Sequence, residues 1–401
     1  MPIKESIDQL GFFGGKPAST DYLHVGRPNI GDRKRLLERF NDMLDCRWLT
    51  NDGPYVQELE LRLADILGVK HCMAICNGTI ALELAIRALE LKGEVIVPSF
   101  TFIATAHALQ WQEITPVFCD IDPVTHNIDP VRIEQLITPR TSGIIGVHVW
   151  GRACDIDALT EISEKHQLKL IFDAAHAFGC SAQGRMIGNF GEAEVFSFHA
   201  TKYFNTFEGG MIATNCDDLA TKIRLMRNFG FVGYDDVIYI GTNGKMSEAS
   251  AIMGLNSIEG MEKFLEINYR NYQLYQNELA DIPGIQLITF DEREKNNFQY
   301  IVVDIDEQMT GVSRDLIVEI LHRENVLARR YFYPGCHQME PYRSYFPHAG
   351  LLLPETEKLV HRLMVLPTGM VIGPDEVQLI SEIIRFTVAH GPRITQRASS
   401  L

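Results

Sequence analysis

Short apolar runs alternate with amphipathic helical patterns between about residues 55 and 260, and this alternation restricts the possible folds more than any other feature of the sequence. Short apolar runs indicate strands, whereas apolar residues three and four positions apart indicate helices. The predicted strands cover residues 72–76, 94–97, 117–120, 143–149, 168–172, 195–198 and 210–213, and the predicted helices cover residues 54–67, 79–91, 102–111 and 156–166. Such alternation predicts a mainly parallel sheet with helices on both faces. Because ligands of these sheets bind at the carboxyl ends of strands, functional residues are expected there.

The pattern changes near residue 261, which predicts a second, smaller unit. Its predicted elements are helices at residues 262–279, 313–325 and 375–389 and a strand at residues 298–303. The polar tail 391–401 is expected to be frayed. We therefore predict an N-terminal arm (1–30), a large three-layer α/β/α domain (31–260) and a smaller C-terminal α/β domain (261–401), the last two joined by a continuous helix.

The chain of 401 residues is acidic, with 37 Lys and Arg against 52 Asp and Glu and a formal net charge of -15. Nucleic-acid binding depends on clustered basic residues, so no nucleic-acid partner is expected. The first ten residues lack the regions of a signal peptide. The longest uncharged run, residues 95–112, contains Pro, Ser, Thr, His and Gln, which disfavour a membrane span. We predict a cytoplasmic protein without a membrane partner.

The eight cysteines are scattered without a Cys-x-x-Cys pair. Zinc sites usually need such paired ligands, so no metal site is expected. Free cysteines usually behave as small buried residues, and we expect reduced structural thiols.

One lysine stands in unusual surroundings. Lys202 follows an apolar strand and precedes a Gly-Gly pair, with aromatic neighbours at Phe196, Phe198, Tyr203, Phe204 and Phe207. Lone lysines are usually solvated, but apolar surroundings disfavour the ammonium form and lower the pKa of the amine. A partly neutral amine is what Schiff-base formation requires, so Lys202 is a candidate nucleophile.

Two further segments carry candidate ligands. Asp173 ends an apolar strand, where an Asp most often caps the next helix. The turn Asn77-Gly78-Thr79 precedes a helix and offers free amides and a hydroxyl to a phosphate, although most such turns bind nothing. Neither a Walker loop nor a GxGxxG fingerprint is present. A phosphate turn, a strand-end acid and a lysine in this order are typical of pyridoxal phosphate (PLP) enzymes.

Several segments of the sequence together resemble the nucleotide-sugar aminotransferases of the DegT/StrS type, and the resemblance covers nearly the whole chain. The matching segments are 48–54 (Trp-Leu-Thr-Asn-Asp-Gly-Pro), 76–79 (Cys-Asn-Gly-Thr), 98–105 (Pro-Ser-Phe-Thr-Phe-Ile-Ala-Thr), 173–177 (Asp-Ala-Ala-His-Ala), 196–202 (Phe-Ser-Phe-His-Ala-Thr-Lys) and 241–248 (Gly-Thr-Asn-Gly-Lys-Met-Ser-Glu). The resemblance implies the aspartate-aminotransferase-like fold, PLP fold type I.

The resemblance also implies catalytic roles for matching positions. Lys202 is expected to hold PLP as a Schiff base and to move the proton, and Asp173 to keep the pyridine nitrogen protonated. Phe102 matches the aromatic residue that stacks on the ring. His176 matches a position beside the phenolic oxygen of the cofactor.

For the cofactor phosphate, the resemblance implies ligands from two chains. Gly78, Thr79 and Ser197 match the ligands from one subunit. Asn243 matches an asparagine that reaches the phosphate of the neighbouring subunit, which implies a homodimer with shared active sites. Without the resemblance, Asn243 is more simply a loop residue.

The substrate side departs from the family pattern. Many relatives carry aromatic residues on both sides of the Asn243 position, where this chain has Thr242 and Gly244, and many have His at the position of Tyr331. The candidate substrate residues are Glu208, Arg329, Tyr331 and His337. Arg329 and its neighbour Arg330 are candidates to contact a diphosphate, although a surface pair fits the sequence equally well.

The implied reaction is amino transfer from glutamate or glutamine to a keto-sugar on a nucleotide, foremost a dTDP-linked 4-keto- or 3-keto-6-deoxyhexose. One alternative is a transaminase for a cyclitol or another ketone without a nucleotide. A sugar dehydratase of the family is disfavoured because those relatives replace the lysine with His. A PLP-binding regulator would need a helix-turn-helix or a basic arm, and the sequence shows neither.

Overall fold

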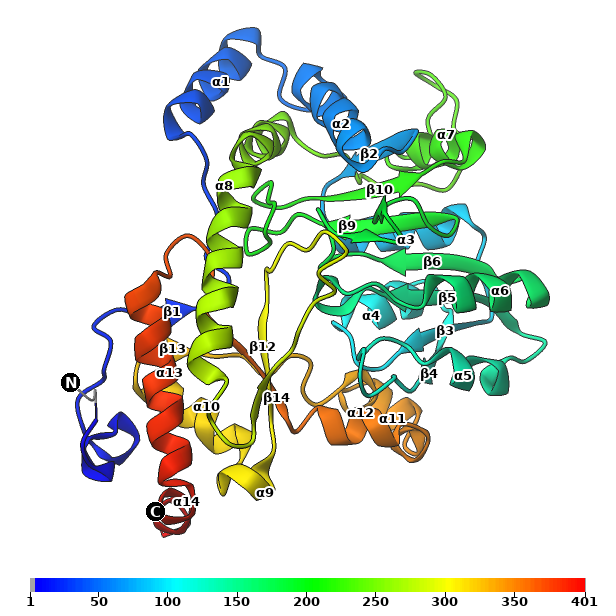
Figure 1. Ribbon diagram of the computed structural model, residues 1–401. Coiled ribbons are helices and arrows are strands. Elements are labelled where there is room, and N and C mark those ends of the chain that lie inside the picture. The colour runs from blue at the N-terminus through cyan, green and yellow to red at the C-terminus, as the bar shows by residue number, and fades with distance from the viewer. Residues whose placement is uncertain (1–3, 401) are drawn as a thin grey trace.

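A seven-stranded sheet forms the centre of the computed structural model, which describes residues 4–400 (Figure 1). The strand order is β2-β10-β9-β6-β5-β3-β4, and of these strands β10 alone runs antiparallel to its neighbours. The strands are β2 (His71–Ile75), β3 (Glu94–Pro98), β4 (Thr115–Cys119), β5 (Thr141–Val147), β6 (Lys169–Asp173), β9 (Ala193–Ser197) and β10 (Gly210–Thr214). The predicted mainly parallel sheet is confirmed.

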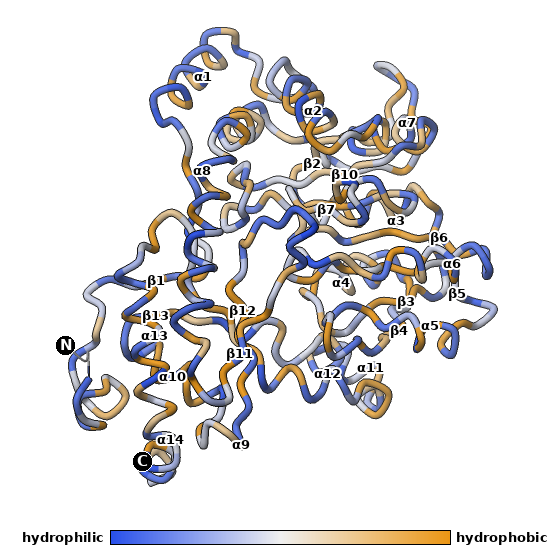
Figure 2. The backbone as a smooth tube through the Cα atoms, in the orientation of Figure 1, coloured by the Kyte–Doolittle hydropathy of each residue, from blue (hydrophilic) through white to orange (hydrophobic). Residues whose placement is uncertain are grey.

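Helices cover both faces of this sheet. One face carries α2 (Pro54–Leu67), α5 (Pro130–Ile133), α6 (Ile156–His166) and α8 (Glu248–Leu279), and the other carries α3 (Gly78–Ala88), α4 (Ala104–Gln110) and α7 (Asp217–Met226). Because the strands are buried from both sides, their apolar residues run continuously instead of alternating. Figure 2 shows this as hydrophobic colour along the central strands such as β6. A small hairpin, β7 (Ser181–Ala182) with β8 (Arg185–Met186), follows β6.

The long helix α8 begins earlier than the sequence pattern predicts. Its first residue is Glu248, not residue 262, and the Ser247 hydroxyl caps it by accepting the amide of Ser250 at 3.1 Å. The buried Glu248 carboxylate accepts the amides of Tyr55 and Val56, which begin α2. The first part of α8 is buried beside α2, so it lacks the charged outer face that marks the second part. The proposed domain boundary at residue 260 therefore falls inside one continuous helix.

A second, antiparallel sheet lies beyond the middle of α8 (Figure 1). Its order is β11 (Ile285–Leu287), β12 (Ile301–Ile305), β14 (Leu363–Leu366). The helices of this part are α9 (Glu307–Thr310), α10 (Arg314–Arg323), α11 (Tyr342–Tyr345), α12 (Pro354–Leu359), α13 (Pro374–Ala389) and α14 (Gly391–Ala398). The expectation that the C-terminal tail is frayed is wrong. The tail forms helix α14, which is stabilised by the burial of Ile394 and by the ion pair between Arg397 and Asp8 at 2.6 Å.

The N-terminal segment packs on this second part of the molecule, and α1 (Arg33–Cys46) follows it. Strand β1 (Leu23–His24) pairs in parallel with β13 (Val326–Leu327). The fully buried Glu324 carboxylate accepts the amides of Gly11 and Ala18, each at 2.7 Å. The Lys4 ammonium pairs with the same carboxylate at 2.8 Å. One acidic side chain thus ties residues 4–18 to the end of α10.

The expectation that the cysteines are buried is corrected for two of the eight. Cys72, Cys119, Cys154, Cys180 and Cys336 are buried and Cys76 is half-buried, but Cys46 and Cys216 are exposed. All eight are free thiols. Within residues 4–400, no cluster of three His, Cys, Asp or Glu side chains is suited to hold a metal ion. No helix in the same range has both the length and the apolar character needed to cross a bilayer.

Candidate active site

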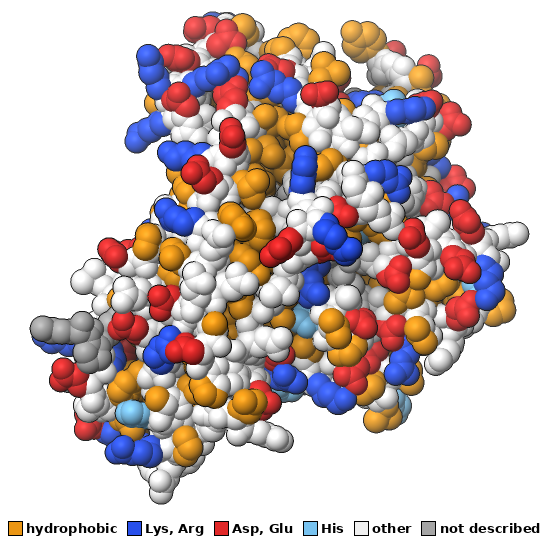
Figure 3. Space-filling view, in the orientation of Figure 1, with side chains coloured by type: hydrophobic (Ala, Val, Ile, Leu, Met, Phe, Trp, Pro, Cys, Tyr) orange, Lys and Arg blue, Asp and Glu red, His pale blue; other side chains and the backbone are white. Residues whose placement is uncertain are grey.

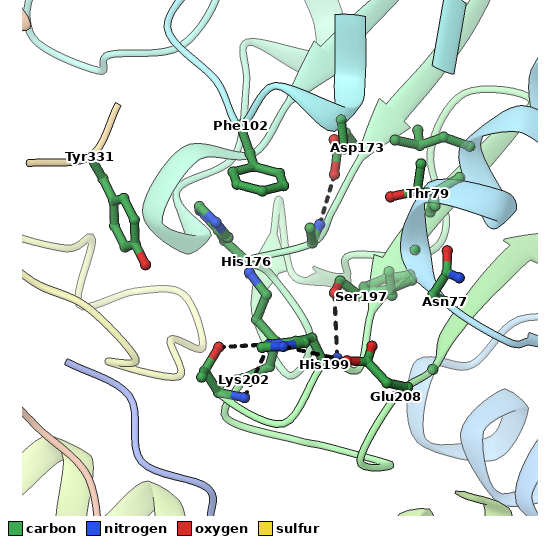
Figure 4. A pocket seen from close by; sticks show the side chains of 18 of the residues that line it. Asn77, Thr79, Phe102, Asp173, His176, Ser197, His199, Lys202, Glu208 and Tyr331 are labelled. Carbon is green, nitrogen blue, oxygen red and sulfur yellow. Dashed lines mark hydrogen bonds and ion pairs between the residues drawn. The ribbon is translucent and has the colours of Figure 1, made fainter. Parts of the chain in front are cut away.

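A cavity of about 280 Å³ lies at the carboxyl ends of β6 and β9, beside the first turn of α3 (Figure 4). This is the edge of the sheet where ligands of parallel α/β folds bind. Seven of the predicted cofactor residues line it, namely Gly78, Thr79, Phe102, Asp173, His176, Ser197 and Lys202. Residues that lie up to 124 positions apart in the sequence are thus brought to one site by the strand order.

The first turn of α3 forms a seat for an anion. Asn77 caps the helix by accepting the amide of Ile80 at 2.8 Å, and the amides of Gly78 and Thr79 have no acceptor within the helix. The Ser197 hydroxyl at the end of β9 accepts the amide of His199 at 3.5 Å, so its own proton is free for a ligand. A Cβ atom on Gly78 would lie 3.1 Å from that of Ser197, which explains the glycine. Helix amides and two hydroxyls suit a phosphate.

Asp173 is the last residue of β6, as predicted, and its carboxylate is buried at the far end of the cavity from Tyr331 (Figure 4). Burial raises the pKa of this carboxyl group, while donors and the Lys202 charge act in the opposite direction. The donors are the Thr105 hydroxyl at 2.8 Å and the Ala175 amide at 3.1 Å. A buried carboxylate held this way fits a cationic ring nitrogen as its partner.

Thr105 belongs to a short chain of buried hydroxyl groups. Its oxygen lies 3.1 Å from the Thr101 hydroxyl. Because the single proton of Thr105 is donated to Asp173, Thr101 must be the donor in this second contact. Both hydroxyls therefore stabilise the ionised form of Asp173, in series.

Removing this donor is expected to shift the pH range of cofactor binding. In Thr105→Val the ionised form of Asp173 loses a hydrogen bond, so the pKa of Asp173 rises. As the pH is lowered, the variant is therefore expected to lose its affinity for the cofactor at a higher pH than the wild type does. Loss of a hydrogen bond to a buried charge predicts an affinity decrease of about ten-fold. Titrating the apo protein with PLP at a series of pH values measures this shift. Thr105→Ser, which keeps the hydroxyl, should titrate like the wild type; equal profiles for Val and Ser would contradict the role.

Lys202 extends its side chain toward His176 inside the cavity (Figure 4). Burial lowers the pKa of its amine to about 8, while the charge of Asp173 limits the decrease. The neutral amine is therefore more populated at pH 7 than in an ordinary lysine, which is almost entirely charged. The half-buried Lys202 thus has the lowered pKa that its aromatic surroundings predict, and its neutral amine is able to act as a nucleophile.

His176 is fixed in one tautomer. The amide of Trp150 donates to its Nδ1 at 3.3 Å, and burial beside the Lys202 charge lowers the pKa of the ring well below its usual range. A neutral ring that accepts at Nδ1 carries its proton on Nε2. The ring is stacked against Trp150 and Phe332, with interplanar angles of 19° and 12°. Its Nε2–H is therefore held ready to donate to an oxygen in the cavity.

A second cavity of about 290 Å³ adjoins the first and shares Phe102, Tyr331 and Phe332 with it. Phe102 is 58% exposed, which is unusual for a phenylalanine. A flat ring stacked on it would cover the exposed face. Arg329 and Arg330 line this second cavity. The Arg329 guanidinium lies 5.1 Å from the centre of the Tyr331 ring, whereas Arg330 is paired with Asp315 at 2.9 Å.

Three other predicted residues lie differently. Glu208 lines the first cavity, is exposed and lies 3.6 Å from His199. His337 is a correction, because it lines neither cavity and its two ring nitrogens are bound to Ser99 and Glu357, each at 2.6 Å. We therefore withdraw it from the substrate residues. Asn243 is exposed and outside the cavity of its own chain, beside Cys76.

Sequence reasoning missed Thr105, Tyr300 and His199, which contribute to the site. Thr105 lies within a quoted family segment, but its bond to Asp173 depends on how α4 packs beside β6. Tyr300 comes from the second part of the molecule, and its hydroxyl accepts a hydrogen bond from Lys202 Nζ at 3.2 Å. Its place inside the predicted strand 298–303 gave no signal of a link to a residue 98 positions earlier.

A half-buried lysine with a depressed pKa, a buried acid and an anion seat at a helix N-terminus, on an α/β/α scaffold, define a PLP-dependent enzyme of fold type I. The residues that line the cavity fit the group: the seat would hold the phosphate, Asp173 would pair with the ring nitrogen, His176 would donate to the phenolic oxygen, Phe102 would stack on one ring face and Lys202 would bind the reactive carbon. When bound, PLP supplies that electrophilic carbon and a ring that accepts electrons.

Comparison with known proteins identifies the family. The model of the DegT/DnrJ/EryC1/StrS aminotransferase family matches residues 31–385, and the chain belongs to this family of PLP-dependent transaminases. A dTDP-4-amino-4,6-dideoxy-D-glucose transaminase of Shigella dysenteriae is 38% identical over 367 residues, which cover 90% of this chain and 98% of that protein. A GDP-perosamine synthase of Caulobacter vibrioides is 36% identical and covers 80% of this chain and 86% of its own.

Solved structures agree with this placement. The structure of DesI in the presence of its TDP-sugar product superposes with a TM-score of 0.95 and 49% identity, covering 98% of this chain and all of that one. PseC of Helicobacter pylori, an aminotransferase in pseudaminic acid biosynthesis, superposes with a TM-score of 0.85 and 27% identity, covering 92% and 100%. The fold and the cofactor inferred from the sequence are confirmed.

Proposed function

We propose that this transaminase moves an amino group from glutamate or glutamine to a nucleotide-linked keto-deoxysugar, foremost a dTDP-4-keto-6-deoxyhexose, with the 3-keto sugar as the second choice. One observation carries the proposal. Lys202, whose amine has a lowered pKa, lines the cofactor cavity, and an adjoining second cavity is lined by Arg329. Relatives whose names include dTDP-linked sugars support the nucleotide. In each half-reaction Lys202 would take a proton from one carbon and return it to another.

The second cavity is suited to the diphosphate of such a substrate. Its wall offers Arg329 without a carboxylate partner among the described side chains, next to the aromatic ring of Tyr331. A guanidinium binds two phosphate oxygens at once. Glu208 and Tyr331, on the first cavity, are proposed to contact the sugar.

Arg329→Gln tests the diphosphate contact. The KM for the sugar nucleotide is expected to rise by about ten-fold or more, because one charge-assisted contact is lost, while the KM for glutamate stays unchanged. Steady-state kinetics with each substrate varied separately provide the measurement. Arg343→Gln, which removes an exposed arginine paired with Glu340, is the matched control. A rise in the glutamate KM alone would instead assign Arg329 to the amino donor.

One experiment tests the reaction itself. The pyridoxamine form of the enzyme is incubated separately with dTDP- and GDP-linked 4-keto and 3-keto sugars and with a keto-cyclitol, and products are identified by NMR. We expect an amino sugar from a nucleotide-linked substrate. Product from the cyclitol alone would favour the transaminase without a nucleotide, and DNA binding without any turnover would favour a PLP-binding regulator.

We also propose a homodimer in which Asn243 binds the phosphate of the partner subunit's cofactor. Asn243 is exposed, and the loop before it presents large apolar side chains, among them Tyr234 at 99% exposure. Apolar side chains also gather on the face over α1, α2 and α8 (Figure 3). Exposed apolar groups of this extent are typical of subunit interfaces.

For the compartment we propose the cytoplasm, where free thiols such as these eight persist.

Mixing two inactive chains tests the shared site. In a dimer of one Lys202→Ala chain and one Asn243→Ala chain, one of the two sites draws both residues from intact chains. Equal mixing with free subunit exchange is expected to return about a quarter of the wild-type rate, because half of the dimers are mixed and each has one intact site. Mass spectrometry verifies the exchange. An exchanged mixture that stays inactive would contradict the shared site.

A further inference from the structure

The amine of Lys202 is held by a residue from outside the sheet that carries it. Lys202 Nζ lies 3.2 Å from the hydroxyl of Tyr300, which accepts its hydrogen bond. Tyr300 immediately precedes β12 in the second part of the molecule. The two residues meet across the cofactor cavity, which both of them line.

Tyr300 is itself held firmly. Its ring is buried and packs on Trp150 and His176, with centroid distances of 5.4 Å and 4.5 Å. Burial raises the pKa of its hydroxyl, so the group stays protonated at physiological pH and is able both to accept and to donate. A hydroxyl on a ring that is packed in this way offers a fixed point to a flexible lysine.

The residues just before Tyr300 bind the two loops that carry the cofactor residues. The Asn297 side chain donates to the carbonyl groups of His176 and Phe178, at 2.8 Å and 3.0 Å. The Gln299 side chain accepts the amide of Tyr203, directly after Lys202, at 2.6 Å. The Gln299 amide in turn donates to the Asn297 side chain at 3.0 Å. Residues 297–300 thus form one clip, which joins the loop after β6, the loop after β9 and the lysine amine.

We propose that Tyr300 is a positioning residue that holds the amine of Lys202 over the cavity whenever the lysine is detached from the cofactor. When Lys202 is not bound to a cofactor, its free amine would have to carry a proton between two carbon atoms in the same cavity. A lysine side chain has four rotatable bonds, so an amine that is not held in place would lose its alignment with these two carbon atoms. The proposal rests on the transaminase chemistry and needs no particular sugar.

The rival explanation is that Tyr300 only fills space beside Trp150 and His176. Tyr300→Phe separates the two, because it keeps the ring and removes the hydroxyl. Tyr275→Phe is the matched control: Tyr275 is buried as well, and its hydroxyl donates to the carbonyl of Pro367 at 2.9 Å, away from the cavity.

The test follows covalent attachment of PLP to the apo protein by stopped-flow absorbance. The observed rate at increasing PLP concentration separates docking, given by the half-saturating concentration, from bond formation by Lys202, given by the plateau. Tyr300→Phe is expected to lower the plateau about ten-fold, the effect of one lost positioning hydrogen bond, with an unchanged half-saturating concentration. Tyr275→Phe should leave both unchanged. A plateau within two-fold of the wild type, or a change in docking alone, would overturn the proposal.

A second measurement applies to turnover. With glutamate deuterated at its α carbon, Tyr300→Phe should show a larger isotope effect than the wild type, because misplacement of Lys202 makes proton transfer slower. An unchanged isotope effect would count against the role.

The pair Tyr300→Gln and Tyr300→Met repeats the attachment test at matched side-chain length. Gln should attach faster than Met, and equal rates would oppose the proposal. If the attachment result holds and no keto-sugar is aminated, the proposed substrate fails while the role of Tyr300 stands.

Discussion

Lys202→Ala is expected to reduce transamination by at least about 10⁴-fold, since it removes both the nucleophile and the proton carrier. No other lysine lines the cofactor cavity within the described part of the chain, so no neighbouring amine is placed to substitute. Turnover of glutamate with a keto-sugar nucleotide gives the measurement. Lys263→Ala, which removes an exposed lysine of α8, serves as the control and should retain full activity.

Chemical mapping makes this prediction specific. Borohydride reduction of the wild-type enzyme should fix the cofactor on the peptide that contains Lys202, as identified by mass spectrometry. In Lys202→Ala the same treatment should leave no cofactor attached. A label on another lysine, or substantial turnover by the variant, would show that the nucleophile lies elsewhere.

Asp173→Asn is expected to keep the fold and to lose about 10²- to 10⁴-fold in turnover, as when a charge aimed at the transition state is removed. The amide has nearly the same shape, and its oxygen is able to accept from the Thr105 hydroxyl, while its NH2 group replaces the oxygen that accepts the Ala175 amide. A neutral amide does not hold a proton on the ring nitrogen, and the ring then accepts electrons poorly.

The measurement combines cofactor content with turnover. Asp173→Asn should contain PLP after purification, or regain it at higher PLP concentration, and should still turn over slowly. Turnover close to that of the wild type would mean that another acid pairs with the ring nitrogen. Asp173→Glu, which retains the charge but lengthens the side chain, indicates how strictly the position of the carboxylate is set.

The central sheet was predictable because its strands are buried on both faces and therefore appear as continuous apolar runs. Helix α6 (Ile156–His166) matches the predicted bounds, since the Asp155 side chain caps its start and no tertiary feature disturbs the pattern. Helix α8 was shortened in the prediction because the buried first part lacks the amphipathic pattern. The helical tail at α14 was missed because its stability comes from contacts with Asp8 and Phe13, far away in the sequence.

The candidate site divides in the same way. Residues on strand ends and helix starts, such as Asp173 and Thr79, lie where their segments predict, because local structure alone places them at one edge of the sheet. His337 was wrongly included because its partners Ser99 and Glu357 come from distant segments. Tyr300 was overlooked for the same reason, since only the packing of the second sheet against the first brings it to Lys202.

The attachment of the N-terminal segment has a practical consequence for recombinant versions of the enzyme. The family match begins at residue 31, so a protein trimmed to that boundary would keep every matched residue. Such a protein would lack Lys4, Gly11 and Ala18, and the fully buried carboxylate of Glu324 would be left without these three donors. It would also lose Ile7, Leu10 and Leu23, so apolar residues of the second part that pack against them would be exposed to water and the fold would be less stable. Purification tags are therefore better placed ahead of an intact first segment than substituted for it.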